Sequence, residues 1–150
     1  MQVRVQESDF GVATELAAIC RNRPQIGAVA CFVGLVRDIS EHSEVRELTL
    51  EHYPGMTEKA LQAIVDQAAQ RWPIIDARVV HRVGRLQPCD QIVLVAVASE
   101  HRGDAFAACE FIIDYLKTHA PFWKRELTPS GTRWVEARQA DEQASERWRR

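Results

Sequence analysis

The sequence lacks a long apolar run, a secretory signal and a strong charge of either sign. Its longest apolar stretch, IVLVAVA at residues 92–98, has the length of a strand and is too short to span a membrane. The N-terminal segment MQVRVQESDF carries no apolar core of the kind that signal peptides need, so we expect a cytoplasmic protein. The formal net charge of −2 gives no general attraction to nucleic acid or to anionic membranes. Any anion-binding site must therefore be local.

Paired cysteines and cofactor motifs are also missing. The four cysteines are widely spaced and form no C-x-x-C pair. Without a secretory signal we expect them to be reduced thiols, with Cys31 and Cys109 packed as small core residues. No spacing of His, Cys and Asp suggests a metal site, and the chain has neither a G-x-G-x-x-G motif nor a Walker loop. We therefore expect neither a metal ion nor a cofactor.

The apolar patterning that is present predicts an α+β fold in one domain over residues 1–150. We expect helices to pack on a mixed or mostly antiparallel sheet. Strands are predicted at 2–5, 27–37 (a buried strand), 45–53, 77–84 and 91–99, with a hairpin around the turn TPSGT. Helices are predicted from Asp9, from Thr57 and from Asp104, the last with Phe106, Cys109, Ile113 and Leu116 on its buried face. The tail at 139–150 is predicted to be helical and to fray at its end.

Lysine is scarce, and its distribution is uneven. Of the 19 basic residues 16 are arginines and three are lysines, and two of these, Lys117 and Lys124, lie within eight positions. A buried lysine can lose its proton and act as a base or nucleophile, whereas arginine stays charged. Lys117 falls in the last turn of the third helix and Lys124 on the following strand, an order that can bring both amines to one cavity. A lysine at a helix C-terminus also balances the helix dipole, so the residues alone leave a structural role open.

A second basic cluster follows the strand predicted at 91–99. His101 and Arg102 lie just before a helix start, where backbone N–H groups hold anions, and Arg37 ends the apolar strand at 27–37. A solvated His-Arg pair is the alternative. His52 and His81 lie in strand patterns, and we expect them to be hydrogen-bonded structural residues. Together these residues predict an anion-binding pocket with one or two candidate amines, and they do not identify its substrate.

Five segments in this order resemble the large, catalytic subunit of molybdopterin synthase: GAVACFVGLVRD, LTLEHYPGMTEKAL, HRVGRL, SEHRGDAF and DYLKTHAPFWKRE. The resemblance runs from about residue 27 to about residue 138. It implies an α/β hammerhead-type sandwich with an additional small antiparallel β subdomain. It also implies a sulfurtransferase that converts a cyclic pyranopterin monophosphate into molybdopterin by inserting two sulfurs as a dithiolene, in molybdenum cofactor biosynthesis.

The resemblance also implies partners and site residues. The sulfur comes as a thiocarboxylate on the C-terminal Gly-Gly of a small ubiquitin-like subunit, and two copies of the large subunit form the homodimer core of a heterotetramer. By resemblance, the catalytic residues are Lys117 and Lys124. From the chemistry of an amine we assign Lys117 the acid-base role and Lys124 an electrostatic one. The residues implied for substrate binding are Arg37, His101, Arg102, Phe32 and, from the neighbouring subunit, Arg138. Leu35 and Asp38 depart from the family pattern, in which a basic residue and an asparagine are common.

Two other hypotheses remain at this point. A non-catalytic scaffold would only dock the small subunit, but a degenerate copy of that kind should have lost a lysine or the His-Arg pair, and this chain keeps them. A regulatory domain that binds a phosphorylated ligand would need the basic clusters without needing Lys117. Replacing Lys117 with alanine separates these hypotheses, because only the enzyme requires turnover to collapse while partner binding survives.

Overall fold

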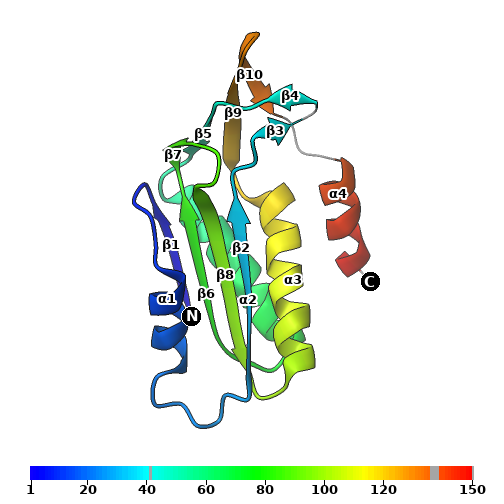
Figure 1. Ribbon diagram of the computed structural model, residues 1–150. Helices are drawn as coiled ribbons and strands as arrows, with labels where there is room; N and C mark the ends of the chain where they lie inside the picture. Colours follow the sequence, from blue (N-terminus) through cyan, green and yellow to red (C-terminus); the bar gives the residue numbers. More distant parts are fainter. Residues whose placement is uncertain (41, 136–138, 150) are drawn as a thin grey trace.

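The computed structural model describes residues 1–40, 42–135 and 139–149, and its main element is a mixed four-stranded sheet (Figure 1). The strands follow one another across the sheet in the order β1 (Gln2–Gln6), β6 (Ile74–Arg82), β8 (Gln91–Ser99) and β2 (Ala28–Leu35). β1 pairs parallel with β6, and the other two pairings are antiparallel. Within the described part of the chain, β2 is therefore an edge strand.

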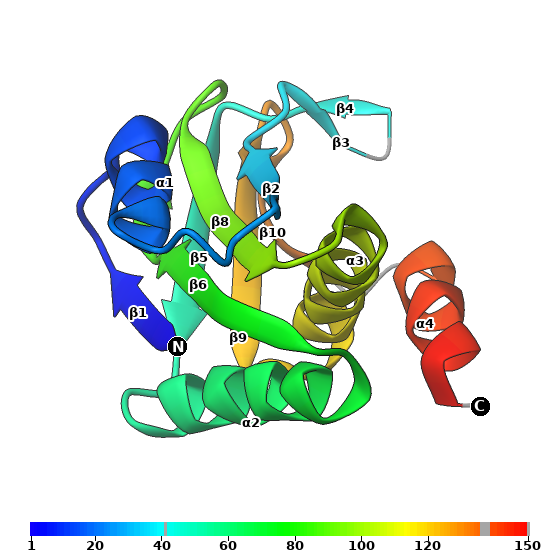
Figure 2. The same cartoon turned by 90° about the horizontal axis from the view of Figure 1, so that it is seen from below.

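Helices cover both faces of this sheet (Figure 2). They are α1 (Val12–Cys20), α2 (Met56–Arg71) and α3 (Arg102–His119). On one face, Ile19 of α1 packs against Ala96 and Ala98 of β8. On the other, Val95 of β8 belongs to the core formed with α2 and α3. Because successive side chains of a strand point to opposite faces, β8 is buried on both sides, which explains its unbroken apolar run.

A second sheet, entirely antiparallel, lies beyond one end of the main sheet, in the upper part of Figure 1. Its strands are, in order, β10 (Gly131–Val135), β9 (Phe122–Thr128), β5 (Glu47–His52) and β7 (Gly84–Leu86). A two-stranded ribbon of β3 (Ile39–Ser40) and β4 (Ser43–Glu44) follows β2 along the chain. The predicted α+β class is confirmed, and the second sheet is the kind of small antiparallel unit that the resemblance implied.

The C-terminal tail packs on α3 as α4 (Gln139–Glu146) and a short 3₁₀ helix (Arg147–Arg149). The indole of Trp148 meets the rings of Trp72 and Phe111 edge-on, at centroid distances of 5.5 and 5.7 Å. Its Nε1 also donates a hydrogen bond to Asp114 Oδ2 at 2.7 Å. Trp148 thus joins the tail to α3 and to Trp72, and the fraying of its last residues stays a prediction. None of the helices in the described ranges is long and apolar enough to cross a membrane.

Two predictions about burial were wrong. Phe106 lies outside the buried face of α3 and is 65% exposed, since that face is formed instead by Ala105, Ala108, Phe111 and Ile112. β2 is not a fully buried strand, because among the described residues it has a neighbouring strand on one side only, and the Cys31 side chain is exposed. The three predicted helices begin within three residues of the predicted positions, which is the usual uncertainty at helix ends.

Candidate active site

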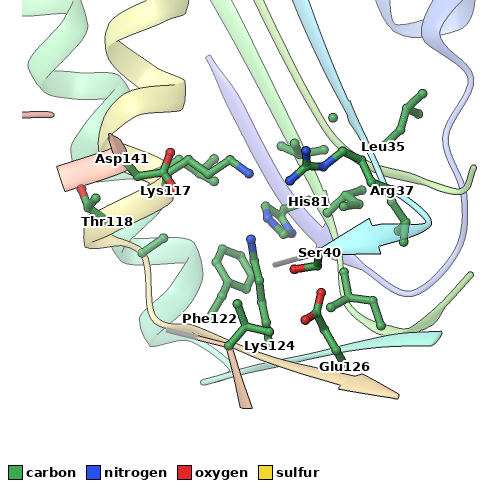
Figure 3. A pocket seen from close by; sticks show the side chains of 18 of the residues that line it. Leu35, Arg37, Ser40, His81, Lys117, Thr118, Phe122, Lys124, Glu126 and Asp141 are labelled. Atoms are coloured by element: carbon green, nitrogen blue, oxygen red, sulfur yellow. The ribbon is translucent and has the colours of Figure 1, made fainter. Parts of the chain in front are cut away.

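A cavity of about 360 Å³ opens where three elements meet: the C-terminal end of α3, the end of β2 and the inner face of β9 (Figure 3). Lys117 reaches it from the last turn of α3, Lys124 from β9 and Arg37 from the segment after β2. In Figure 3 the two amines and the guanidinium point into the same space. The order helix, break, strand therefore brings the two lysines to one cavity, as the sequence indicated.

Local geometry explains how both lysines come to face this space. After α3 the chain turns at Ala120, whose carbonyl oxygen accepts a hydrogen bond from the Phe122 N–H at 2.9 Å. β9 then runs as an extended strand in which every second side chain points the same way. Phe122, Lys124 and Glu126 accordingly all line the cavity. Lys117, at the end of α3, and Lys124, early in β9, thus face one cavity because the chain reverses between them.

The charges in the cavity favour an anion. Its described lining includes three basic side chains, those of Arg37, Lys117 and Lys124, and two acidic ones, those of Glu126 and Asp141. Glu126 is 93% buried and forms an ion pair with Arg133 at 3.1 Å.

Arg133 also donates a hydrogen bond to the Ser40 carbonyl oxygen at 2.7 Å and so ties β10 to the β3–β4 ribbon. Because Arg133 balances Glu126, the positive charges of the cavity exceed the negative ones, as a site for a phosphate or a carboxylate requires.

His81 of β6 lines the cavity, although its place in a strand pattern predicted a structural role. Its ring stacks on Phe122 with a centroid distance of 3.9 Å and an interplanar angle of 18°. Burial, which is the largest cause, and the positive charges of Lys124 and Lys117 together lower the pKa of His81 to about 3, against the opposing effect of its backbone hydrogen bond. The imidazole is therefore neutral at physiological pH. Alternation along β6 places residue 81 on one face, but only the tertiary pairing shows that this face meets the lysines.

The other predicted site residues lie elsewhere. His101 precedes α3 and Arg102 is its first residue, so both are at the opposite end of this helix from Lys117. At about 1.5 Å per residue the separation is roughly 20 Å. Phe32 lines a different cavity, beside Phe106, and is 36% exposed. Arg138 lies outside the described residues.

One departure from the family pattern, Leu35, and the expectation of no metal site can both be compared with the structure. Leu35 lines the lysine cavity and is 53% exposed, so an apolar side chain stands at its edge where relatives often carry a basic residue. In the described ranges no group of three or more His, Cys, Asp or Glu side chains is placed to hold a metal ion.

Comparisons with known proteins agree on one family. The family model described as "MoaE protein" matches residues 5–119. A "Molybdopterin synthase catalytic subunit" from Ralstonia nicotianae is 67% identical, covering 97% of this chain and 83% of the relative. Its counterpart from Escherichia coli is 60% identical, covering 98% and 97%.

Two solved structures resemble the chain closely in fold and sequence. The MoaE protein of Burkholderia ambifaria superposes with a TM-score of 0.84 at 58% identity, covering 98% of this chain and 97% of that one. A molybdopterin synthase structure from Staphylococcus aureus superposes with a TM-score of 0.80 at 34% identity, covering 88% and 95%. Sequence and structure comparisons thus select proteins of the same family over nearly the full length of the chain.

Proposed function

The chain belongs to the MoaE family, the catalytic subunits of molybdopterin synthase, and we propose that the cavity between α3 and β9 is its active site. Its activity is sulfur transfer in molybdenum cofactor biosynthesis. The substrate is a cyclic pyranopterin monophosphate, and each of two sulfurs arrives as a thiocarboxylate on the C-terminus of a small ubiquitin-like subunit. The observation that carries the proposal is the convergence of two lysine amines and one guanidinium on one cavity.

Each basic side chain has a task that suits its chemistry. The planar guanidinium of Arg37 can donate two parallel hydrogen bonds to phosphate oxygens and so fixes the pterin precursor. Lys124, as an ammonium, holds the thiocarboxylate anion in place for attack. Lys117 acts as the acid-base group, which gives a proton to the departing oxygen or accepts one as sulfur adds. His81, being neutral, adds no charge to this set.

Residues at the far end of α3 join this site only if a second copy of the chain supplies them. His101 and Arg102 are roughly 20 Å from Lys117 along one helix, a distance that a single pterin monophosphate does not span. We therefore place them, and Arg138, in the site of the neighbouring copy within a homodimer. The exposed aromatic rings of Phe32 and Phe106, next to the edge strand β2, are consistent with a contact between copies. A small subunit bound to each copy completes a heterotetramer.

We also propose that residues 1–150 form one domain and act in the cytoplasm. The cavity draws its lining from β2, β6, α3, β9 and α4, which span most of the chain, so the site needs these elements folded together. All four cysteines are unpaired in the structure, as suits a reducing compartment.

The test is a reconstituted reaction. The purified chain is mixed with thiocarboxylated small subunit and the pterin precursor, and the dithiolene product is measured for wild type, Lys117→Ala, Lys124→Ala and the control Lys59→Ala. Lys59 is an exposed lysine of α2, so its variant controls for loss of one positive charge. Loss of a general acid-base group lowers turnover by about 10²- to 10⁴-fold, and we expect Lys117→Ala to fall in this range while still binding the small subunit.

Other outcomes lead to other conclusions. An unimpaired Lys117→Ala variant would move the acid-base chemistry to Lys124. If folded wild type binds the small subunit and yields no product, the chain is a docking scaffold and the enzyme proposal fails. A Lys59→Ala variant as impaired as Lys117→Ala would show that the assay reports general charge rather than the cavity.

A further inference from the structure

His81 occupies an unusual position for a buried histidine. It is only 4% exposed, yet it lines the lysine cavity. Along β6 it lies on the same face as Ala77 and Val79, which belong to the core under α2 and α3. Residue 81 comes where that apolar core ends and the polar cavity begins. A polar group at this boundary keeps one side in the core and turns the other towards the reacting groups.

The hydrogen bond of His81 determines which ring nitrogen carries its proton. Nδ1 lies 2.8 Å from the carbonyl oxygen of Arg82. A carbonyl oxygen can only accept, so Nδ1 carries the hydrogen and donates it. In a neutral imidazole the other nitrogen, Nε2, then has a free lone pair and acts as an acceptor. The stacked ring of Phe122 prevents the imidazole from rotating away from this arrangement.

Lys124 is the donor that the geometry brings to this acceptor. Phe122, which stacks on His81, and Lys124 are two positions apart on β9 and lie on the same face of the strand. Figure 3 shows the amine of Lys124 directed towards the His81 ring. The basic side chains that lower the pKa of His81 are Lys124 from β9, Lys117 from α3 and His52 from β5, in decreasing order of effect.

We propose that His81 is a positioning residue for Lys124, whose amine donates a hydrogen bond to His81 Nε2 and is thereby aimed at the substrate. A neutral acceptor is the chemistry required at this place. A carboxylate would cancel part of the positive charge that attracts the anionic substrates, and an imidazolium would have no lone pair and would repel the lysine. The inference rests on the proposed function, because it assigns His81 a task within that site.

Two substitutions of His81 distinguish the contribution of Nδ1 from that of Nε2. The amide of asparagine reaches the position of Nδ1, whereas the longer glutamine side chain reaches that of Nε2. His81→Asn should therefore keep the contact with the Arg82 carbonyl and lose the acceptor for Lys124. Because hydrogen bonds to charged groups are strong, we expect its turnover to fall about 10- to 100-fold with an unchanged dissociation constant for the small subunit. His81→Gln should recover most of this loss.

A pH–rate profile distinguishes positioning from packing. Removing an acceptor destabilises the ammonium form of Lys124, so the basic limb of the profile should move to lower pH in His81→Asn and stay near its wild-type position in His81→Gln. Circular dichroism and thermal melting verify that both variants are folded. If both variants lose activity equally with an unmoved profile, or if only His81→Gln is impaired, the role of Nε2 is refuted.

An NMR measurement makes the inference testable apart from turnover. The ¹⁵N shifts of His81 in the wild-type protein, mixed with small subunit, should show a neutral ring protonated on Nδ1 between pH 6 and 8. A ring protonated on Nε2 would overturn the inference even in an active enzyme. If wild type makes no product while the Nδ1–H form is observed, the proposed function fails and the geometry of His81 stands.

Discussion

Mild acid should destabilise this fold through His81 in a way that can be calculated. The pKa of His81 is lowered by burial from 6.5 to about 3 in the native protein. Below pH 6.5 the unfolded chain therefore binds a proton that the native chain does not, so stability falls as pH decreases through the window from 6.5 to 3. At pH 5 the difference amounts to about 2 kcal/mol relative to pH 8. For a chain of this size, this loss of unfolding free energy lowers the melting temperature by about 4–8 °C.

Urea unfolding at pH 8 and pH 5 measures this effect directly. Other groups also titrate, so the informative quantity is the loss of unfolding free energy in wild type minus the loss in His81→Gln, which has no imidazole at this position. We expect wild type to lose about 2 kcal/mol more than the variant. His119→Gln, which removes an exposed histidine, serves as the control and should behave like wild type. Equal losses in wild type and His81→Gln would refute the reasoning, because the buried imidazole would then not remain neutral.

Three other predictions test the packing and the charge of the molecule. Trp148→Ala removes a half-buried indole that packs against Trp72, and should lower the melting temperature by about 4–10 °C in a calorimetric scan; an unchanged value would mean that the tail is not anchored. At Gly27 an added Cβ would come within 2.1 Å of the Glu100 carbonyl oxygen, so Gly27→Ala should cost more than about 3 kcal/mol in urea unfolding, whereas the open position Gly103 should tolerate alanine. Binding of the phosphorylated precursor should weaken several-fold in calorimetry between 50 mM and 500 mM salt, and a salt-independent dissociation constant would contradict a net positive cavity.

Elements whose burial is decided locally could be predicted from the sequence. The stripe on α2 formed by Leu61, Ile64, Val65 and Ala68 is buried, because helical periodicity alone places these residues on one face. The apolar run of β8 could be predicted as a strand because it is continuous, short and of strand length. The two lysines could be placed in one cavity because the break after α3 is short and the strand that follows must run back along the helix end.

Features that depend on long-range pairing could not be predicted. An edge strand and a central strand can have the same composition, so nothing in the sequence showed that β2 is an edge strand in the part of the chain that the structure describes and leaves Cys31 exposed. Likewise, Phe106 follows the apolar period of α3 but faces that same edge. The proposed role of His81 depends on its contact with Phe122, a residue 41 positions away whose strand belongs to the other sheet.

The scarcity of lysine acquires a physical meaning in this cavity. A guanidinium is a broad planar fork that suits a fixed phosphate, and one, that of Arg37, lines the cavity. An ammonium is compact, rotates freely and can exchange its proton, so it suits the place where bonds change. That same freedom makes its direction uncertain unless a neighbour fixes it. A neutral His81 locked by Arg82 and Phe122 provides such a neighbour without altering the charge. In the proposed site two requirements are thus separate: net charge attracts the anions, and an uncharged acceptor on a different side chain orients the amine.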